Sequence, residues 1–228
     1  MLHNSTFATF LIVGPQGSKP MKNMDSITNA QEYYDQIFEQ VQLEREKIVG
    51  AEFTDCKFVK CDFEAAIFDH CRFTHCRFRD CNLSLVQIPE SSFPSTIFEK
   101  SKLIGVDWTQ GNWSQVEFSQ LEGFLDCVLS HSTFIGLELK GIQIKNCIAN
   151  EVDFREADLS KVDFRGTDLT KSLFGNTKLV EADLSRARNY QIDPGNNNLK
   201  AAKFSLPEAM ALLYCMEIEI IEQDDSVW

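Results

Sequence analysis

The sequence predicts an all-β fold in which the chain coils on itself and turns after every five residues. Three observations predict this fold. Large apolar residues recur at every fifth position, small residues recur two positions before them, and 18 of the 228 residues are Phe, against 3 Trp and 4 Tyr. A period of five fits neither the 3.6 residues of a helical turn nor the two-residue alternation of a strand. No straight element can therefore keep these residues on one side.

The large apolar series extends from residue 43 to residue 118 without a gap and resumes, after a slip of one residue, at Phe124. Its members are Leu43, Ile48, Phe53, Phe58, Phe63, Phe68, Phe73, Phe78, Leu83, Ile88, Phe93, Phe98, Leu103, Trp108, Trp113 and Phe118, then Phe124, Leu129, Phe134, Leu139, Ile144, Phe154, Leu159, Phe164, Leu169, Phe174, Leu179 and Leu184. The small Ala149 interrupts the second part of the series. We expect the slip, near residues 119–123, to be a bulge or short loop at a corner, with no long loop inside the repeats.

The small residues, such as Cys56, Cys61 and Ala66, stand two positions before a large one. In an extended segment this separation places both side chains on the same side, which we expect to face inward. The residue between them is often polar, as Asp158 and Asp183 are, and is expected to face outward. Each group of five residues is then one short side of a closed coil.

The repeated unit resembles those of the pentapeptide-repeat family, most clearly at residues 157–161 (ADLSK) and 182–186 (ADLSR). The resemblance covers residues 43–187. It implies a right-handed quadrilateral β-helix of about seven coils, with four units in each coil and residues twenty apart stacked on each other. The expected stacks include Phe58, Phe78, Phe98 and Phe118 on one face, and Phe53, Phe73, Phe93 and Trp113 on another.

Both ends of such a coil need caps, because an open end exposes apolar side chains and unpaired backbone. We expect a mobile tail over residues 1–25 and an N-terminal helical cap over residues 26–42. The apolar residues at roughly helical spacing in this cap are Tyr33, Tyr34, Ile37, Phe38 and Val41. Residues 188–228 are expected to form the C-terminal cap. Its predicted parts are a helix from Ser205 to Tyr214, a strand from Met216 to Ile220, and an acidic tail.

The formal net charge of −12 argues against nucleic acid as a direct ligand, because phosphate binding requires clustered Lys and Arg. No apolar run reaches the roughly 18 residues of a membrane span, and residues 7–13 lack the basic flank of a signal peptide. We therefore expect a cytoplasmic protein without membrane contact. Its eight cysteines are then expected to be reduced thiols.

The His and Cys residues between His70 and Cys76 attract attention as a zinc site. However, Cys71 and Cys76 occupy the inward small position, whereas His70 and His75 fall at outward positions, so the four side chains cannot converge on one tetrahedral ion. His131 has no Ser and Asp placed to form a catalytic triad with it. We expect no metal, no cofactor and no enzymatic activity.

Two functions compete. The first is a protein-interaction module, a rigid rod that binds a protein partner. The second comes from the resemblance: Qnr-type quinolone-resistance proteins mimic DNA, bind the type II topoisomerases DNA gyrase and topoisomerase IV, and dimerise through their C-terminal ends. Residues 53–203 carry 21 acidic and 18 basic groups. This near balance weighs against the second function, because a DNA mimic needs a strongly negative face. The candidate dimer or capping surface consists of Met210, Leu213, Met216, Ile218 and Ile220.

Overall fold

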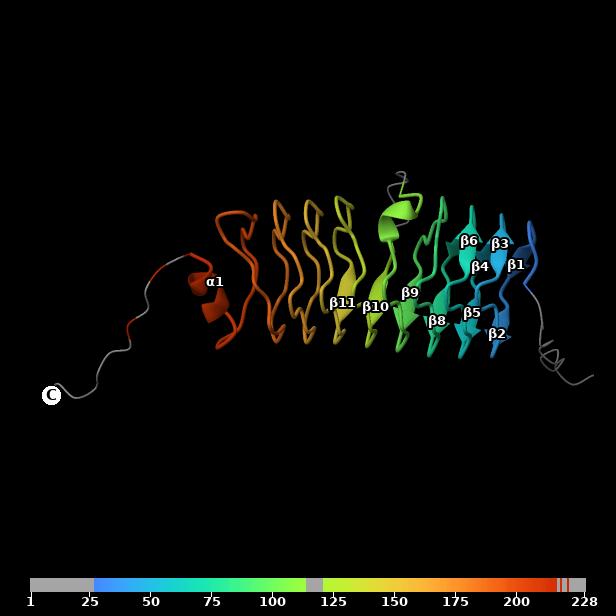
Figure 1. Ribbon diagram of the computed structural model, residues 1–228, viewed down its shortest axis with the longest axis horizontal. Helices are drawn as coiled ribbons and strands as arrows, with labels where there is room; N and C mark the ends of the chain where they lie inside the picture. Colours follow the sequence, from blue (N-terminus) through green and yellow to red (C-terminus); the bar gives the residue numbers. More distant parts are fainter. Residues whose placement is uncertain (1–26, 114–120, 217, 219–220, 222–228) are drawn as a thin grey trace, which may run out of the picture.

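The computed structural model describes residues 27–113, 121–216, 218 and 221. The chain forms a rod of stacked coils, with its N-terminal and C-terminal ends at opposite ends of the rod (Figure 1). The strands are three residues long. They are β1 (Glu32–Tyr34), β2 (Ile37–Glu39), β3 (Lys47–Val49), β4 (Glu52–Thr54), β5 (Lys57–Val59), β6 (Ile67–Asp69), β7 (Arg72–Thr74), β8 (Arg77–Arg79), β9 (Ile97–Glu99), β10 (Gly123–Leu125) and β11 (Gln143–Lys145). A 3-10 helix covers Trp108–Gln110, and the helix α1 covers Met210–Tyr214.

Four parallel ladders run along the rod, each offset from the next by about five residues, which confirms the four-sided coil. The first face is the ladder of β1, β4 and β7, and the second face is the ladder of β2, β5, β8, β9, β10 and β11. The third face is a series of single bridges that begins with Gln42 and Asp62, and the fourth face contains β3 and β6. In the N-terminal half each residue pairs with the residue twenty positions later, as Phe38 does with Phe58.

The corners of the coil use left-handed backbone conformations. Positive φ angles recur every five residues, beginning with Ala30, Asp35, Gln40, Arg45 and Gly50. This conformation costs an L-residue about 1–2 kcal/mol, so the corners oppose folding unless packing and hydrogen bonds compensate. The compensation includes the corner amides themselves, because Asp35 N donates to Thr54 O across to the next coil.

Stacked aromatic rings fill the interior. Phe58 and Phe78 lie parallel with their centroids 4.3 Å apart, and Phe98 follows Phe78 at 4.9 Å. The second predicted stack is confirmed for Phe53, Phe73 and Phe93. The residues that form the core are almost completely buried, and these stacks account for the excess of Phe in the sequence.

The irregularity near residue 120 is larger than the predicted slip of one residue. Gly123 pairs with Ile97, which is twenty-six residues earlier, whereas Ile97 pairs with Arg77, which is twenty residues earlier. The coil therefore gains six residues, which a period of five registers as a gain of one. As a result, Phe124 and not Phe118 follows Phe98 in its stack, with a centroid distance of 5.4 Å. Residues 114–120 lie outside the described residues.

The predicted N-terminal helical cap is wrong. Residues 32–34 and 37–39 are strands of a first coil, and Tyr33 stacks on Phe53 at 4.9 Å. Tyr33 and Phe38 continue the five-residue series, whereas Tyr34 and Ile37, which completed the helical spacing, lie at outward positions. The predicted mobile tail over residues 1–25 lies outside the described residues.

The coil count is also higher than the predicted seven. Within the described residues, the second face holds nine rungs, centred on Phe38, Phe58, Phe78, Phe98, Phe124, Ile144, Phe164, Leu184 and Phe204. The repeat therefore continues past residue 187, up to the short helix α1. A helix is present in the predicted C-terminal region, but it begins at Met210 and not at Ser205. The predicted strand from Met216 to Ile220 falls partly outside the described residues.

The cysteines are packed as small core residues. All eight are free thiols, and seven of them are buried, with Cys215 partly exposed. In one interior column Cys61 and Cys81 stack, with the amide of Cys61 donating to the sulfur of Cys81 at 3.4 Å. Further along the same column, Thr167 Oγ1 donates to the Ile144 carbonyl and accepts from the Cys147 amide at 3.2 Å. Thiols and hydroxyls at this position thus bond backbone groups inside the rod.

Candidate interaction surfaces

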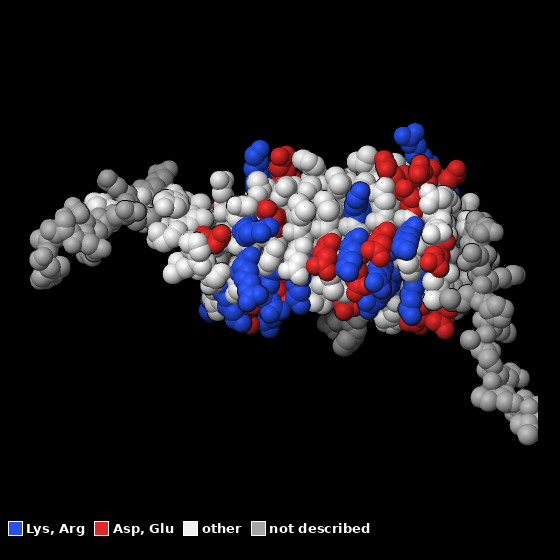
Figure 2. Space-filling model, turned by 90° about the horizontal axis from the view of Figure 1, so that it is seen from below, with Lys and Arg blue, Asp and Glu red and all other residues white. Residues whose placement is uncertain are grey.

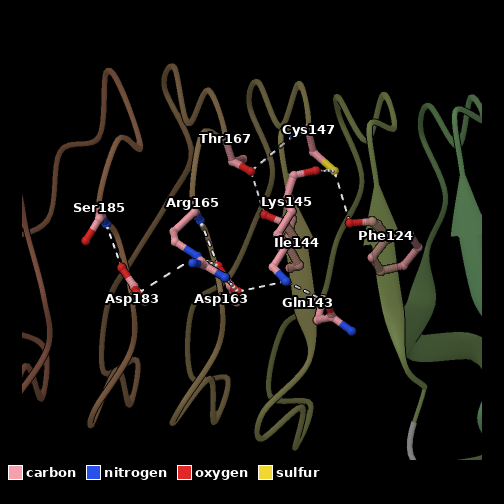
Figure 3. Close-up of polar contacts among 10 residues, drawn as sticks. All are labelled: Phe124, Gln143, Ile144, Lys145, Cys147, Asp163, Arg165, Thr167, Asp183 and Ser185. Atoms are coloured by element: carbon pink, nitrogen blue, oxygen red, sulfur yellow. Dashed lines mark hydrogen bonds and ion pairs between the residues drawn. The ribbon is translucent and has the colours of Figure 1, made fainter.

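The outward side chains form columns, because each outward position repeats in every coil. On the second face, in the C-terminal half of the rod, these columns are charged (Figure 3). Lys145 Nζ lies 3.0 Å from Asp163 Oδ2, and Arg165 Nη2 lies 2.7 Å from the same oxygen. Arg165 Nε also lies 4.0 Å from Asp183 Oδ2 on the next coil. Asp163 and Asp183 are therefore already paired.

The Asp163 carboxyl is held firmly in its charged form. Its partial burial opposes ionisation, but hydrogen bonds from Arg165 and Lys145 outweigh this effect and lower its pKa to about 2. Asp153, which receives a similar side-chain fork from Arg155, also has a lowered pKa. A partner that approached these carboxylates would have to displace the Arg and Lys groups of the protein itself.

The surface of the rod carries charges of both signs. Figure 2 shows the rod from below, with Lys and Arg side chains interspersed with Asp and Glu side chains along that side. This agrees with the near balance of 21 acidic and 18 basic groups between residues 53 and 203. In this view the surface lacks the continuous negative field that a mimic of duplex DNA needs.

The His residues do not join the cysteines. His70 Nδ1 lies 2.6 Å from Asp69 Oδ1, and His75 Nδ1 lies 3.6 Å from Asp55 Oδ1, both at the outer surface. The thiols of Cys71 and Cys76 are buried, and burial raises the pKa of the Cys71 thiol to about 11. Among the described residues, no cluster of three or more His, Cys, Asp or Glu side chains could hold a metal ion.

His131 lies at a corner beside an acidic residue. Its Nδ1 is 3.4 Å from Glu151 Oε2, and Lys171 Nζ approaches the other oxygen of Glu151 at 3.7 Å. These three side chains belong to three successive coils, and none of them is a Ser, Thr or Cys. The contact between Lys171 and Glu151 is a surface ion pair of the kind that contributes about 0–1 kcal/mol to stability.

The C-terminal end of the rod exposes apolar side chains. Of the predicted surface residues, Leu213, Met216 and Ile218 are exposed, Met210 is partly buried, and Ile220 lies outside the described residues. Sequence reasoning missed Leu206 and Tyr214, which are 76% and 68% exposed. On the other side of α1, Ala211 and Leu212 pack against the core. The helix thus covers the last coil with one side and presents apolar atoms to solvent with the other.

A second apolar group lies on the third face and at its corner, and it was not predicted. It consists of Leu85 and Ile148, which are exposed, and Ile104 and Val128, which are half-buried, and we call it the apolar strip. Val128 pairs directly with Ile148 across adjacent coils. No signal in the period of five points to these residues, because the period constrains inward positions only. Of the four residues, only Val128 and Ile148 are separated by one full coil of twenty residues, so no single spacing in the sequence reveals the strip.

Comparison with known proteins agrees with this architecture. A model of the pentapeptide repeat region matches residues 51–123, and a model of eight copies of the pentapeptide repeat matches residues 138–176. The chain is a pentapeptide-repeat protein. Within the described part of this pentapeptide-repeat protein, no helix is long and apolar enough to cross a membrane. No curated protein sequence matches the chain.

Solved structures with the same fold include QnrB1, which is described as a plasmid-mediated fluoroquinolone resistance protein. A trypsin-treated form of QnrB1 matches this pentapeptide-repeat protein with a TM-score of 0.64 and 15% identity, over 86% of this chain and 93% of that chain. Full-length QnrB1 matches with a TM-score of 0.60 and 16% identity, over 84% and 97% of the two chains. At this level of identity the likeness shows the fold alone.

Proposed function

We propose that this pentapeptide-repeat protein is a non-enzymatic interaction module, a rigid rod that binds a protein partner. The observation that carries the proposal is the exposed apolar surface at the C-terminal end, which includes Leu206, Leu213 and Tyr214. Clustered apolar side chains in water typically mark a surface that another protein covers. The filled interior leaves the outer columns and the ends of the rod as the surfaces for binding.

A second copy of the chain is the first partner to test at this end. Sedimentation velocity should compare the natural chain with the double variant Tyr214→Ser and Met216→Ser. If the end is a self-association surface, the natural chain sediments as a dimer and the variant as a monomer. Tyr34→Ser, at the opposite end of the rod, is the matched control because Tyr34 is also exposed. Identical monomer masses for all three proteins would rule out the dimer.

The second candidate function is binding to DNA gyrase or topoisomerase IV. The observation that favours it is the likeness to the QnrB1 structures over nearly their whole length. The paired charges around Asp163 weigh against it, because carboxylates neutralised by Arg and Lys imitate DNA phosphates poorly. We therefore place the general interaction module first and topoisomerase binding second.

A DNA supercoiling assay separates the two candidates. Purified DNA gyrase is assayed with and without a fluoroquinolone across a titration of the protein. Inhibition, or protection from the drug, at micromolar concentrations or below would establish the second candidate. No effect on either measurement would eliminate gyrase as the partner, and topoisomerase IV is then assayed in the same way by decatenation.

A further inference from the structure

The apolar strip crosses the third face from a corner, with one residue in each of four successive coils. Bridges connect Lys102 to Val128 and Val128 to Ile148. At the neighbouring corner, Leu85 lies over Gly105 of the next coil. A Leu85 side-chain carbon is 2.8 Å from the position that a Cβ atom on Gly105 would occupy. Leu85 is 55% exposed and Ile148 is 46% exposed. These side chains offer apolar area that the rod itself does not cover.

Acidic side chains lie next to the strip, toward the N-terminal end of the same face. They are Glu44, Asp62 and Glu64, and among the described residues none of them forms an ion pair, in contrast to Asp163 on the second face. Glu64 Oε2 accepts a hydrogen bond from Asn82 Nδ2 at 3.0 Å, and Asp62 Oδ1 accepts one from the Glu64 amide at 3.0 Å. Neither bond neutralises a charge.

The third face also carries cations, which limit where a basic partner fits. Lys102 stands between Asn82 and Val128 in one column, and Arg45 follows Glu44 at the corner. At the other end of the face, Arg188 Nη2 lies 3.7 Å from Asp168 Oδ2, so that pair is neutral. The three unpaired carboxylates therefore form an acidic group on the N-terminal side of the strip, and Lys102 lies between Asp62 and Val128 in the column.

A partner cannot extend this face by adding a strand. The backbone groups here already bond the neighbouring coils, as Val128 N does with Ser101 O at 3.0 Å and Ile148 N with Cys127 O at 2.9 Å. Docking must therefore use side chains. The pitch of an α-helix, about 5.4 Å, is close to the spacing of neighbouring coils, about 4.8 Å, so a helix lying along the rod can place one turn over each coil.

We propose that the third face binds an amphipathic helical segment of a partner protein, with its apolar side on the strip and Lys or Arg side chains on Glu44, Asp62 and Glu64. This inference rests on the proposed function of a protein-binding rod and assigns it a site. From the rung of Asp62 to the rung of Ile148 there are four steps between coils, or about 19 Å, which a helix spans with about 13 residues.

The test uses a fluorescein-labelled helical peptide of about 14 residues. Leu residues lie along one side of its helix, and Lys residues lie along the opposite side and at one end of the helix. Fluorescence anisotropy should show saturable binding to the full chain. A peptide with Ser in place of Leu and a peptide with Glu in place of Lys should each bind about tenfold more weakly or worse, because about 1.4 kcal/mol of binding free energy corresponds to a factor of ten.

Variants of the rod locate the site. Leu85→Ser with Ile148→Ser should weaken binding about tenfold, and Asp62→Asn with Glu64→Gln should weaken it and reduce its dependence on salt. Ile135→Ser, at an exposed apolar residue of the fourth face, and Tyr34→Ser, at an exposed residue of the first face, are controls that should bind normally. Circular dichroism confirms that each variant is folded.

Three results would overturn the proposal: no binding of the Leu and Lys peptide, equal binding of the Leu and Glu peptide, or binding that the paired Leu85 and Ile148 changes leave intact. Failure here is distinguishable from failure of the interaction module. If a partner protein binds the natural chain and the Leu85 and Ile148 variant equally well, the rod is still an interaction module but its site lies elsewhere.

Discussion

Replacing Phe78 with Ala tests whether the aromatic stacks hold the rod together. Phe78 is completely buried, with parallel rings of Phe58 at 4.3 Å and Phe98 at 4.9 Å on its two sides and the edge of Phe73 at 5.5 Å. Truncating a buried Phe to Ala typically costs about 3–5 kcal/mol of unfolding free energy, because it removes contacts and leaves a cavity. A stacked position in the middle of the ladder should fall in the upper part of that range.

Guanidinium unfolding followed by far-ultraviolet circular dichroism measures this cost. The midpoint of thermal unfolding should also fall, by roughly 10 °C for a chain of this size. Tyr34→Ala is the control, because Tyr34 is 60% exposed and surface substitutions usually change stability by less than about 0.5 kcal/mol. A loss below about 1 kcal/mol for Phe78→Ala would refute the view that the stacks are the main source of stability.

Three further predictions concern a charge, a buried hydroxyl and a corner. The Asp163 carboxyl has a folded pKa of about 2, below its ordinary 3.8. Its stabilising effect is therefore present above about pH 4 and is lost as the pH falls toward 2. In an acid titration of the free energy of unfolding, Asp163→Asn should remove this pH-dependent loss, which amounts to up to about 2 kcal/mol. Thr167→Val should cost about 1–3 kcal/mol in chemical unfolding, because the Ile144 carbonyl and Cys147 amide lose their partner inside the rod; a neutral result would contradict the bonding role. Ala65 has a φ of 54°, so Ala65→Gly should leave the thermal midpoint unchanged or raise it, whereas Ala65→Val should lower it.

The inward-facing residues of this structure could be predicted from sequence, because their packing repeats from coil to coil. Equivalent inward residues of successive coils, such as Phe63 and Leu129, are all buried. Their burial therefore appears in the sequence as an apolar residue at every fifth position. The positions where prediction failed have a physical cause. A six-residue gain before Phe124 looks like a gain of one when the repeat is five, and the aromatic pair Tyr33 and Tyr34 matched a helical spacing although only Tyr33 faces inward.

The candidate surfaces were harder to predict than the core. The C-terminal residues Leu213 and Met216 stood out because they form an apolar segment after the repeats end. Leu85 and Ile148, in contrast, are three coils apart and fall on the same side of the rod only through the register of the ladders. Outward positions tolerate many residue types, so the period gives no information about them.

The buried thiols can report when individual coils of the rod open. Cys56, Cys61, Cys71, Cys76 and Cys81 lie in neighbouring coils of the N-terminal half, and Cys127 and Cys147 mark coils beyond the insertion. An alkylating reagent reaches each sulfur only when its coil separates from the stack, whereas Cys215 is partly exposed in the folded chain. Mass spectrometry of the labelled peptides would therefore time the fraying of individual coils in the natural sequence, without the introduction of a probe.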